Sequence, residues 1–289
     1  MKSPILFFTI LITILSSCKK DDKGGSCESN SGAETIVHDN INREYVLYIP
    51  NSYDGTSAVP LLVNFHGFGG SASEFMSYAD MRSIAETDTF ILAYPQGSCL
   101  DGSSHWNACP TGADNKSDAD DFGFVESMIN EISSQYNIDM ERIYAAGYSN
   151  GGMMAYGLAN YKSDLIAAVA SVSGVMLDCT GPTSHPMPVV HLHGTSDGVL
   201  PYNGGDGWNS AQSTLEHWIN FNNTVLTPTV ISDNNIEHYV YDQGDSLVSV
   251  EHYKYIGGDH VWFNSTFQGQ NTSELVWNFV SRFDINGLR

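Results

Sequence analysis

A serine flanked by glycines stands directly after an apolar run near the middle of the chain. Residues 147–151 read GYSNG, a match to G-x-S-x-G, in which a serine occupies a tight turn between a strand and a helix. Side chains beside that serine would collide with the adjoining strand or helix, so the small residues meet a steric requirement. The hydroxyl of Ser149 is the candidate nucleophile for attack on a carbonyl carbon.

A serine hydroxyl needs a base, because unassisted it is a poor nucleophile near neutral pH. Where the motif occurs in an α/β sheet, the acid and the histidine follow the serine in chain order. Asp197 closely follows an apolar run, and His260 follows two glycines and an aspartate after another run. Asp206 and Asp259 are alternative acids that lack this placement at the end of a strand. The sequence therefore predicts a triad of Ser149, Asp197 and His260.

Two backbone amides are candidates for holding the negative charge that develops during such an attack. The N–H of Asn150 lies at the start of the helix that follows the serine, and the N–H of Phe68 lies in the loop after the apolar run 60–67. His66 stands just before that loop, and we expect it to fix the loop after its strand.

Two histidines two positions apart invite a different interpretation. His191 and His193 would lie on one face of a strand, which is a spacing that a metal site can use. Further ligands are lacking nearby in the sequence, so we expect neither a metal nor an organic cofactor.

Aromatic and polar residues outside the triad are candidates for substrate contact. Trp106 and Asn107 are expected to line a cleft, since exposed aromatic rings often do so. Trp262, next to His260, is a further candidate for substrate contact, with a place in the core as the alternative. Asp120 and Asp121 precede a helical pattern, and helix capping is the simpler interpretation of both.

The amino-terminal segment differs from the rest of the chain. An apolar stretch at 4–15 is too short to anchor a helix across a bilayer, and it is followed by LSSC, ending at Cys18. This segment resembles a bacterial lipobox, and a plain secretory signal is the alternative. We expect a lipoprotein signal peptide at 1–18, a flexible tether at 19–34 and a catalytic domain at 35–289.

Export would place the domain in an oxidising compartment. The expected location is the cell exterior or surface, with an outer-membrane lipid anchor on Cys18, and CKKDD resembles an acidic surface-export tag. The remaining cysteines then favour disulfides. Cys99 and Cys109 bracket a short loop and are the expected pair, while Cys27 and Cys179 pair with each other or stay free. Zinc is the weaker alternative, because no Cys-x-x-Cys occurs.

The charge of the chain limits its partners. Among 289 residues, 12 are Lys or Arg and 33 are Asp or Glu, which gives a formal net charge of -21. Binding to DNA or RNA backbones needs basic surface, so no nucleic-acid partner is expected. Solubility outside the cell is a sufficient reason for the acidity.

The secondary-structure pattern is that of an α/β protein. Apolar runs predict buried strands at 60–67, 89–95, 142–149, 166–174 and 188–194. Alternating runs predict strands at 43–50 and, toward an edge, at 246–256. Helical periodicity occurs at 71–86, 121–136, 149–161, 211–221 and 273–283. We therefore expect a mostly parallel central sheet with helices on both faces.

Six blocks of the chain together resemble one family of esterases. They read NFHGFGG, HWN, DDFGFV, GYSNGGMMAYGLA, HGTSDGVLPY and GGDHVWF, in this order. The family includes polyhydroxybutyrate depolymerases, feruloyl esterases and acetyl xylan esterases, all with the α/β-hydrolase fold. The resemblance implies a secreted carboxylic ester hydrolase that uses the triad and the two amides named above.

Two blocks depart from the family pattern, and both lie beside the acyl pocket. Many members have cysteine after HG, where this chain has Phe68, and GGGHTWP is common where this chain reads GGDHVWF. The SNGG form favours feruloyl or acetyl esters on plant polysaccharide, and a polyester depolymerase is the alternative. A catalytically inactive surface protein that binds polysaccharide, and a peptidase, are alternatives from other classes.

Overall fold

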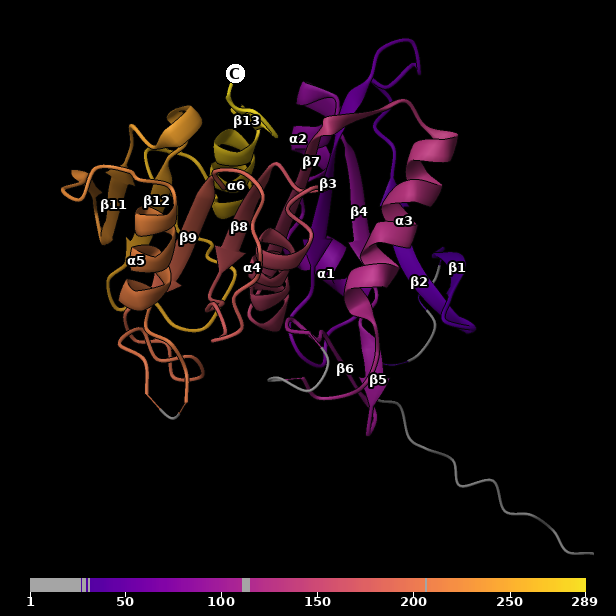
Figure 1. The fold of residues 1–289 in the computed structure, drawn as a ribbon, viewed down its shortest axis with the longest axis horizontal. Coiled ribbons are helices and arrows are strands. Elements are labelled where there is room, and N and C mark those ends of the chain that lie inside the picture. The colour runs from indigo at the N-terminus through magenta and orange to yellow at the C-terminus, as the bar shows by residue number, and fades with distance from the viewer. Residues whose placement is uncertain (1–26, 28–29, 31, 111–114, 206) are drawn as a thin grey trace, which may run out of the picture.

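Ten strands form one twisted sheet at the centre of the molecule (Figure 1). The computed structural model describes residues 27, 30, 32–110, 115–205 and 207–289. The strands of this sheet are β1 (Glu34–His38), β2 (Ile41–Tyr48), β3 (Val59–Phe65), β4 (Ile91–Pro95), β7 (Ile138–Tyr148), β8 (Ala168–Val172), β9 (Val189–Gly194), β10 (Thr229–Asp233), β11 (Ile236–Tyr241) and β12 (Val250–Tyr255). Two short hairpins lie outside it: β5 (Ser98–Leu100) with β6 (Ser103–His105), and β13 (Phe283–Asp284) with β14 (Gly287–Leu288).

The sheet is parallel in its middle and antiparallel at both edges. The strand order is β1-β2-β4-β3-β7-β8-β9-β12-β11-β10. All pairs from β4 to β12 are parallel, whereas β1, β2, β11 and β10 pair antiparallel with their neighbours. Because the carboxyl ends of parallel strands meet at one edge, the loops after β3, β7, β9 and β12 share that edge.

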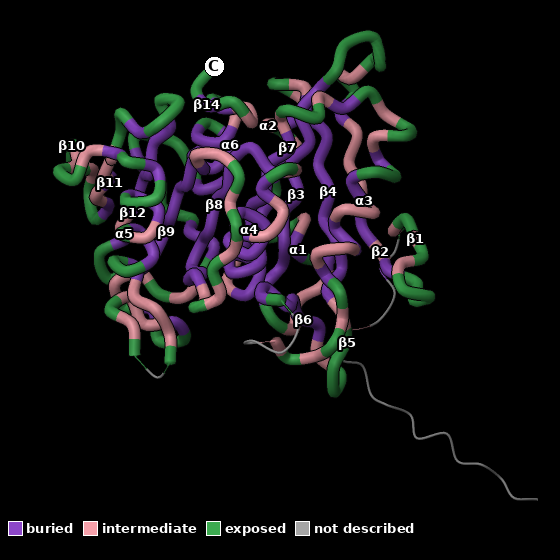
Figure 2. Tube along the Cα trace, viewed as in Figure 1, coloured by how far each residue is buried: buried purple, intermediate pink, exposed green. Residues whose placement is uncertain are grey.

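Helices cover both faces of the sheet, as the apolar runs predict. The helices are α1 (Ala72–Tyr78), α2 (Arg82–Asp88), α3 (Asp121–Gln135), α4 (Asn150–Tyr161), α5 (Ala211–Phe221) and α6 (Thr272–Val280), with a short 3₁₀ turn at Asp245–Leu247. One buried cluster joins α1, α2 and α6 to the sheet, and a second joins α3, α4 and α5 to the opposite face. The central strands are therefore buried on both faces, as Figure 2 shows. None of the helices in the described residues is long and apolar enough to cross a bilayer.

Three features of the fold differ from the sequence-based expectation. The helix expected at 71–86 is two helices, because α1 ends at Tyr78 and α2 starts at Arg82. The hairpin of β10 and β11 was not predicted, although its two-residue turn at 234–235 carries Asn234 with φ 52°. Because this hairpin continues the sheet, β12 lies inside it and not toward an edge.

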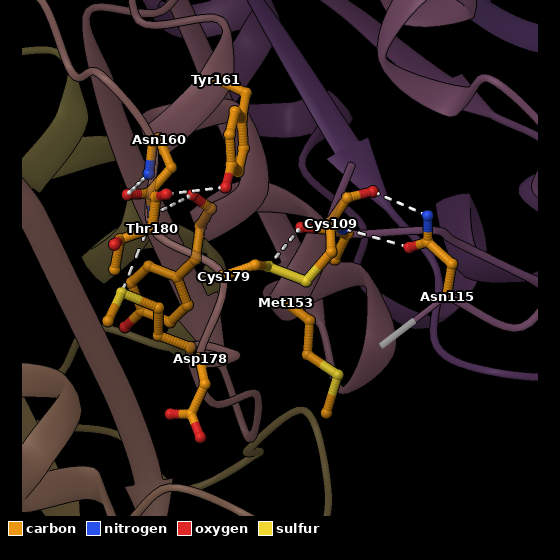
Figure 3. The surroundings of a disulfide bond; sticks show 12 residues. Cys109, Asn115, Met153, Asn160, Tyr161, Asp178, Cys179 and Thr180 are labelled. Atoms are coloured by element: carbon orange, nitrogen blue, oxygen red, sulfur yellow. Dashed lines mark hydrogen bonds between the residues drawn. A yellow bond between two sulfur atoms is a disulfide. The ribbon is translucent and has the colours of Figure 1, made fainter. Parts of the chain in front are cut away.

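The disulfides also differ from the expected pairing. Cys99 pairs with Cys27 and Cys109 pairs with Cys179, so the predicted Cys99–Cys109 bridge is wrong. Cys99 lies on β5, opposite Ser104 of β6, and the chain then runs on to a buried Cys109. Figure 3 shows the Cys109–Cys179 bridge, with the side chain of Asn115 hydrogen-bonded to the backbone of Cys109.

The predicted segments at the amino terminus fall largely outside the described residues. The signal peptide at 1–18 and the lipidation site Cys18 lie outside them entirely. Several residues of the predicted tether at 19–34 belong to the domain: Cys27 through its disulfide, Asn30, which is buried and hydrogen-bonded to Gln96 and Ser73, and Glu34, which begins β1.

Candidate active site

Ser149 occupies the sharp turn between β7 and α4. Its backbone has φ 56° and ψ -120°, a conformation that L-residues adopt at a cost of about 1–3 kcal/mol. A Cβ on Gly151 would collide with the carbonyl oxygen of Phe65, and one on Gly147 with that of Gly151. The two glycines therefore let the turn close tightly against β3 and α4, as the motif predicts.

The structure brings the three predicted triad residues into one hydrogen-bonded line. Ser149 Oγ lies 2.8 Å from His260 Nε2, and His260 Nδ1 lies 2.7 Å from Asp197 Oδ2. A carboxylate can only accept, so the imidazole donates from Nδ1 and its Nε2 is free to accept the serine proton. This is the geometry of a serine nucleophile, a base and an orienting acid.

Asp197 is buried and accepts hydrogen bonds on both of its oxygens. The backbone N–H groups of Val199 and Leu200 donate to Oδ1 at 2.9 and 2.8 Å. His260 and His193 both contact Oδ2, His193 at 3.2 Å. Burial alone would raise the pKa of Asp197, but these donors outweigh it and hold that pKa well below its usual range. The carboxylate is therefore ionised across neutral pH.

The loop that carries His260 is tied to the helices and strands beside it. The hydroxyl of Tyr148, which precedes the nucleophile, donates to the carbonyl of His260 at 2.8 Å. The hydroxyl of Tyr78 on α1 accepts from the N–H of Trp262 at 3.0 Å. Asp259, considered above as an alternative acid, is exposed and accepts from the backbone N–H of His260, whereas the imidazole bonds Asp197. Asp206 lies outside the described residues.

The two predicted oxyanion donors lie at the start of α4 and in the loop after β3. Asn150 is the first residue of α4, and Phe68 lies in the turn after β3. Among the described residues, neither backbone N–H has a protein acceptor. The turn is fixed by His66, which donates from Nδ1 to the Gly67 carbonyl and accepts from the N–H of Gly97, as expected of a structural residue.

The side chain of Asn150 has a role that the sequence did not reveal. Its Oδ1 accepts from the backbone N–H of Trp106 at 2.8 Å and its Nδ2 donates to the Trp106 carbonyl at 3.1 Å. This reciprocal pair joins the residue after the nucleophile to the loop that follows β6. The side chain of Asn150, bonded to the backbone of Trp106, therefore holds this loop against the turn at Ser149.

Three candidate residues for substrate contact are buried in the protein interior. Trp106 is only 1% exposed, packs edge-on against Phe65 and donates from Nε1 to the His66 carbonyl. Asn107 is 1% exposed and bonds the backbone of the 115–119 segment. Trp262 packs edge-on against Phe75 and reaches Ser273. The cleft assignments of Trp106 and Asn107 are therefore wrong, and of the two alternatives for Trp262 the structure shows the core one.

A pocket beside the nucleophile is lined by His66 and Phe68, which the sequence singled out, and by residues that it did not. It has a volume of about 200 Å³ and is lined by residues of the β3–α1 loop, of α1 and of the end of β7: His66, Gly67, Phe68, Gly70, Ser71, Glu74, Phe75, Tyr78 and Tyr148. A Cβ on Gly67 would lie 3.3 Å from the Cβ of Ser149, so this part of the pocket wall lies close to the nucleophile. Its aromatic lining suits an apolar or aromatic group, and Glu74 adds one acidic side chain.

The predicted helix caps divide into one cap and one buried acid. Asp120 caps α3 by accepting from the N–H of Gly123. Asp121 instead is buried, where it bonds Arg43 at 2.7 Å and the backbone of Asn107 at 2.8 Å. Helix capping is therefore the wrong interpretation of Asp121, because its side chain turns inward to pair with an arginine from β2.

Potential metal ligands lie at two places among the described residues. His191 and His193 are buried and lie 3.2 Å apart, with His191 Nε2 directed at His193 Nδ1, so these two nitrogens are used by each other. Among the described residues, the group with ligand atoms close enough for an ion is His38, Asp39 and Asp120, at the surface beside α3. That group lies apart from the triad, and His38 is already hydrogen-bonded to Asp120.

The chain is similar to known proteins over most of its length. The family model described as esterase PHB depolymerase matches residues 43–204. Feruloyl esterase B from Piromyces equi is 30% identical over 264 residues, which is 84% of this chain and 46% of that protein. A bifunctional acetylxylan esterase/xylanase from Neocallimastix patriciarum is 27% identical over 85% of this chain and 34% of its own length. The chain thus spans between a third and a half of these relatives.

Solved structures of known fold superpose on this chain. An acetyl xylan esterase from Aspergillus awamori superposes with a TM-score of 0.63 at 18% identity, over 79% of this chain and 94% of that one. An S-formylglutathione hydrolase from Agrobacterium tumefaciens superposes with a TM-score of 0.60 at 12% identity, over 88% and 97%. The protein has the α/β-hydrolase fold, as its sequence predicts. The chain belongs to the esterase family whose model it matches.

Proposed function

We propose that this protein is a serine esterase that hydrolyses carboxylic esters through an acyl-enzyme on Ser149. The observation that carries the proposal is the hydrogen-bonded line from Ser149 through His260 to Asp197, at 2.8 and 2.7 Å, on a strained turn. Membership of an esterase family supports it independently. Geometry, as well as order along the chain, supports the proposed roles of Asp197 as orienting acid, His260 as base and Ser149 as nucleophile.

The proposed reaction has two steps. His260 Nε2 accepts the proton of Ser149 as Oγ bonds the ester carbonyl carbon, and the backbone N–H groups of Asn150 and Phe68 stabilise the oxyanion. The protonated imidazole, held by Asp197, gives its proton to the departing alcohol, which leaves an acyl-serine. Water, deprotonated by the same imidazole, then attacks the acyl carbon, and the imidazolium returns its proton to Ser149 Oγ as the bond to the serine breaks and the acid is released.

The substrate we favour is a feruloyl or acetyl ester on plant polysaccharide. The pocket of about 200 Å³ beside Ser149 supports an acyl group of this size, and the rings of Phe68, Phe75 and Tyr78 suit a planar aromatic one. The relatives named feruloyl esterase and acetylxylan esterase agree with this choice. Polyhydroxybutyrate is the competing substrate, because the family model carries that name.

The chemistry is tested at the nucleophile. We expect Ser149→Ala to abolish turnover of p-nitrophenyl acetate while its thermal unfolding stays close to that of the wild type. A fluorophosphonate probe should label the wild-type protein on Ser149 and leave the variant unlabelled. Near-wild-type turnover in the variant would refute the assignment. A wild-type protein that resists the probe would favour an inactive polysaccharide-binding protein.

The substrate is tested by comparing kcat/KM for methyl ferulate, acetylated xylan and polyhydroxybutyrate. We expect the first two to be cleaved in preference to the polyester. Cleavage of short p-nitrophenyl esters alone would contradict the assignment to polysaccharide esters. A peptide substrate belongs in the same panel, since a peptidase can use the same triad.

We also propose export and lipid anchoring through Cys18, a residue outside the described part of the chain. Two disulfides within the described residues support an oxidising compartment. Cys18→Ser should move the protein from the membrane fraction to the soluble fraction and abolish incorporation of labelled palmitate. Unchanged fractionation would leave a plain secretory signal as the better interpretation.

A further inference from the structure

A line of buried polar side chains runs from the helix after the nucleophile to the triad carboxylate. The hydroxyl of Tyr156 on α4 lies 2.8 Å from His191 Nδ1, and His191 Nε2 lies 3.2 Å from His193 Nδ1. His193 Nε2 in turn lies 2.9 Å from the Leu200 carbonyl and 3.2 Å from Asp197 Oδ2. The line therefore ends on the oxygen that His260 also contacts.

The two acceptors at the end of the line determine which nitrogen of each histidine carries a proton. The Leu200 carbonyl and the carboxylate of Asp197 can only accept, so His193 carries a proton on Nε2 and shares it between them. When each imidazole holds one proton, His193 Nδ1 accepts from His191 Nε2, and His191 Nδ1 accepts from the hydroxyl of Tyr156. Every donor in the line then points toward Asp197.

Burial keeps this line out of contact with water. His191 and His193 are both 0% exposed and Tyr156 is 1% exposed. Burial, with the neighbouring His193 and His252, holds the pKa of His191 well below its usual range, and burial raises the pKa of Tyr156. His191 therefore stays neutral and Tyr156 keeps its proton across the range in which an esterase works.

We infer that His193 is a positioning residue, which fixes Asp197 Oδ2 for its hydrogen bond to His260. This inference rests on the proposed function, since it assigns a task within the same triad. The two N–H donors hold Oδ1 of the carboxylate in place. They do not fix the position of Oδ2, because the carboxylate can still rotate about the Cβ–Cγ bond. A second donor on Oδ2, itself packed against His191 in the sheet, sets that rotation.

The test compares two variants that differ in how far their amide reaches. His193→Gln can present an N–H where the imidazole Nε2 lies, whereas His193→Asn reaches only the Nδ1 position, facing His191. With p-nitrophenyl acetate, we expect kcat of His193→Asn to fall about 10- to 100-fold, the size of one hydrogen bond to a charged group, with little change in KM. His193→Gln should recover most of that loss.

A matched control lies in the same buried cluster. His252 is as deeply buried, bonds the His191 carbonyl and Tyr202, and does not contact Asp197. His252→Asn should therefore keep kcat within about threefold of wild type. In an Asp197→Asn background, the further change His193→Asn should cost little, because the carboxylate through which it acts is already gone.

Several results would overturn the inference. These are wild-type kcat in His193→Asn, an equal loss in His252→Asn, no recovery in His193→Gln, or the same fold-loss with and without Asp197→Asn. The proposed function fails separately. If Ser149→Ala stays active or the fluorophosphonate labels another residue, the triad itself is wrong, whatever the His193 variants do.

Discussion

At the scale of single residues, the active-site turn depends on the space that glycine leaves. Ser149 has a positive φ, and the turn closes because Gly151 lets α4 approach the end of β3. The same approach brings the N–H of Asn150 near the loop that holds Phe68. A methyl group at this position would therefore disturb stability and oxyanion binding together.

We expect Gly151→Ala to destabilise the protein by about 1–3 kcal/mol or more and to lower kcat, because its Cβ would meet the Phe65 and His66 carbonyls. Gly198→Ala is the matched control. Gly198 is next to Asp197, but a Cβ there meets no atom within 4 Å. Urea unfolding and p-nitrophenyl acetate turnover measure both effects. Equal behaviour of the two variants would show that the close approach at Gly151 is not required.

The sequence predicted that Ser149, Asp197 and His260 lie together, but not which residues hold their loops in place. Ser149, Asp197 and His260 follow a known order, each after a strand of the parallel part of the sheet, so their proximity could be predicted from the sequence. The contacts of Tyr148 with His260 and of Tyr78 with Trp262 join positions 112 and 184 residues apart, and no local pattern encodes them. The prediction that Trp106 lines a cleft was wrong for the same reason, because the burial of this side chain depends on partners that are distant in the sequence.

At the scale of elements, periodicity predicted the buried parallel strands well and the edges poorly. Strands such as β3 and β9 are apolar throughout because both faces are covered. The edge strand β10 is mostly exposed, so its sequence lacks that signal. The predicted disulfide pairing was wrong because pairing depends on how separate loops meet at the carboxyl edge of the sheet, not on the spacing of the cysteines along the chain.

The disulfide pairing is checked by peptide mapping under non-reducing conditions. We expect peptides that join Cys27 to Cys99 and Cys109 to Cys179. A Cys99–Cys109 peptide would contradict the structure. The Cys109–Cys179 bridge spans 70 residues, so Cys109→Ala with Cys179→Ala should lower the free energy of unfolding by about 4 kcal/mol in the loop-entropy model. Turnover should persist at low temperature, since the bridge does not contact the triad.

At the scale of the whole molecule, folding buries several histidines without charge. His66, His191 and His252 are each at most 2% exposed, and burial lowers the pKa of all three. The pKa falls to about 4 for His66 and to about 3 for His252. Neutral imidazoles serve the molecule as hydrogen-bond links between strands and loops, and the consequence is sensitivity to acid.

Stability should therefore fall as the pH drops from about 7 to about 5. Below a pH of about 6.5 the unfolded chain binds a proton on each of these histidines, and the folded protein does not, so each costs on the order of 1–2 kcal/mol at about pH 5. The loss levels off only below the folded pKa, which is about 3 for His252. His252→Asn removes one such group, so its free energy of unfolding should depend less steeply on pH than that of the wild type. Urea unfolding across this pH range measures both slopes, and identical slopes would show that His252 does not take part in the acid response.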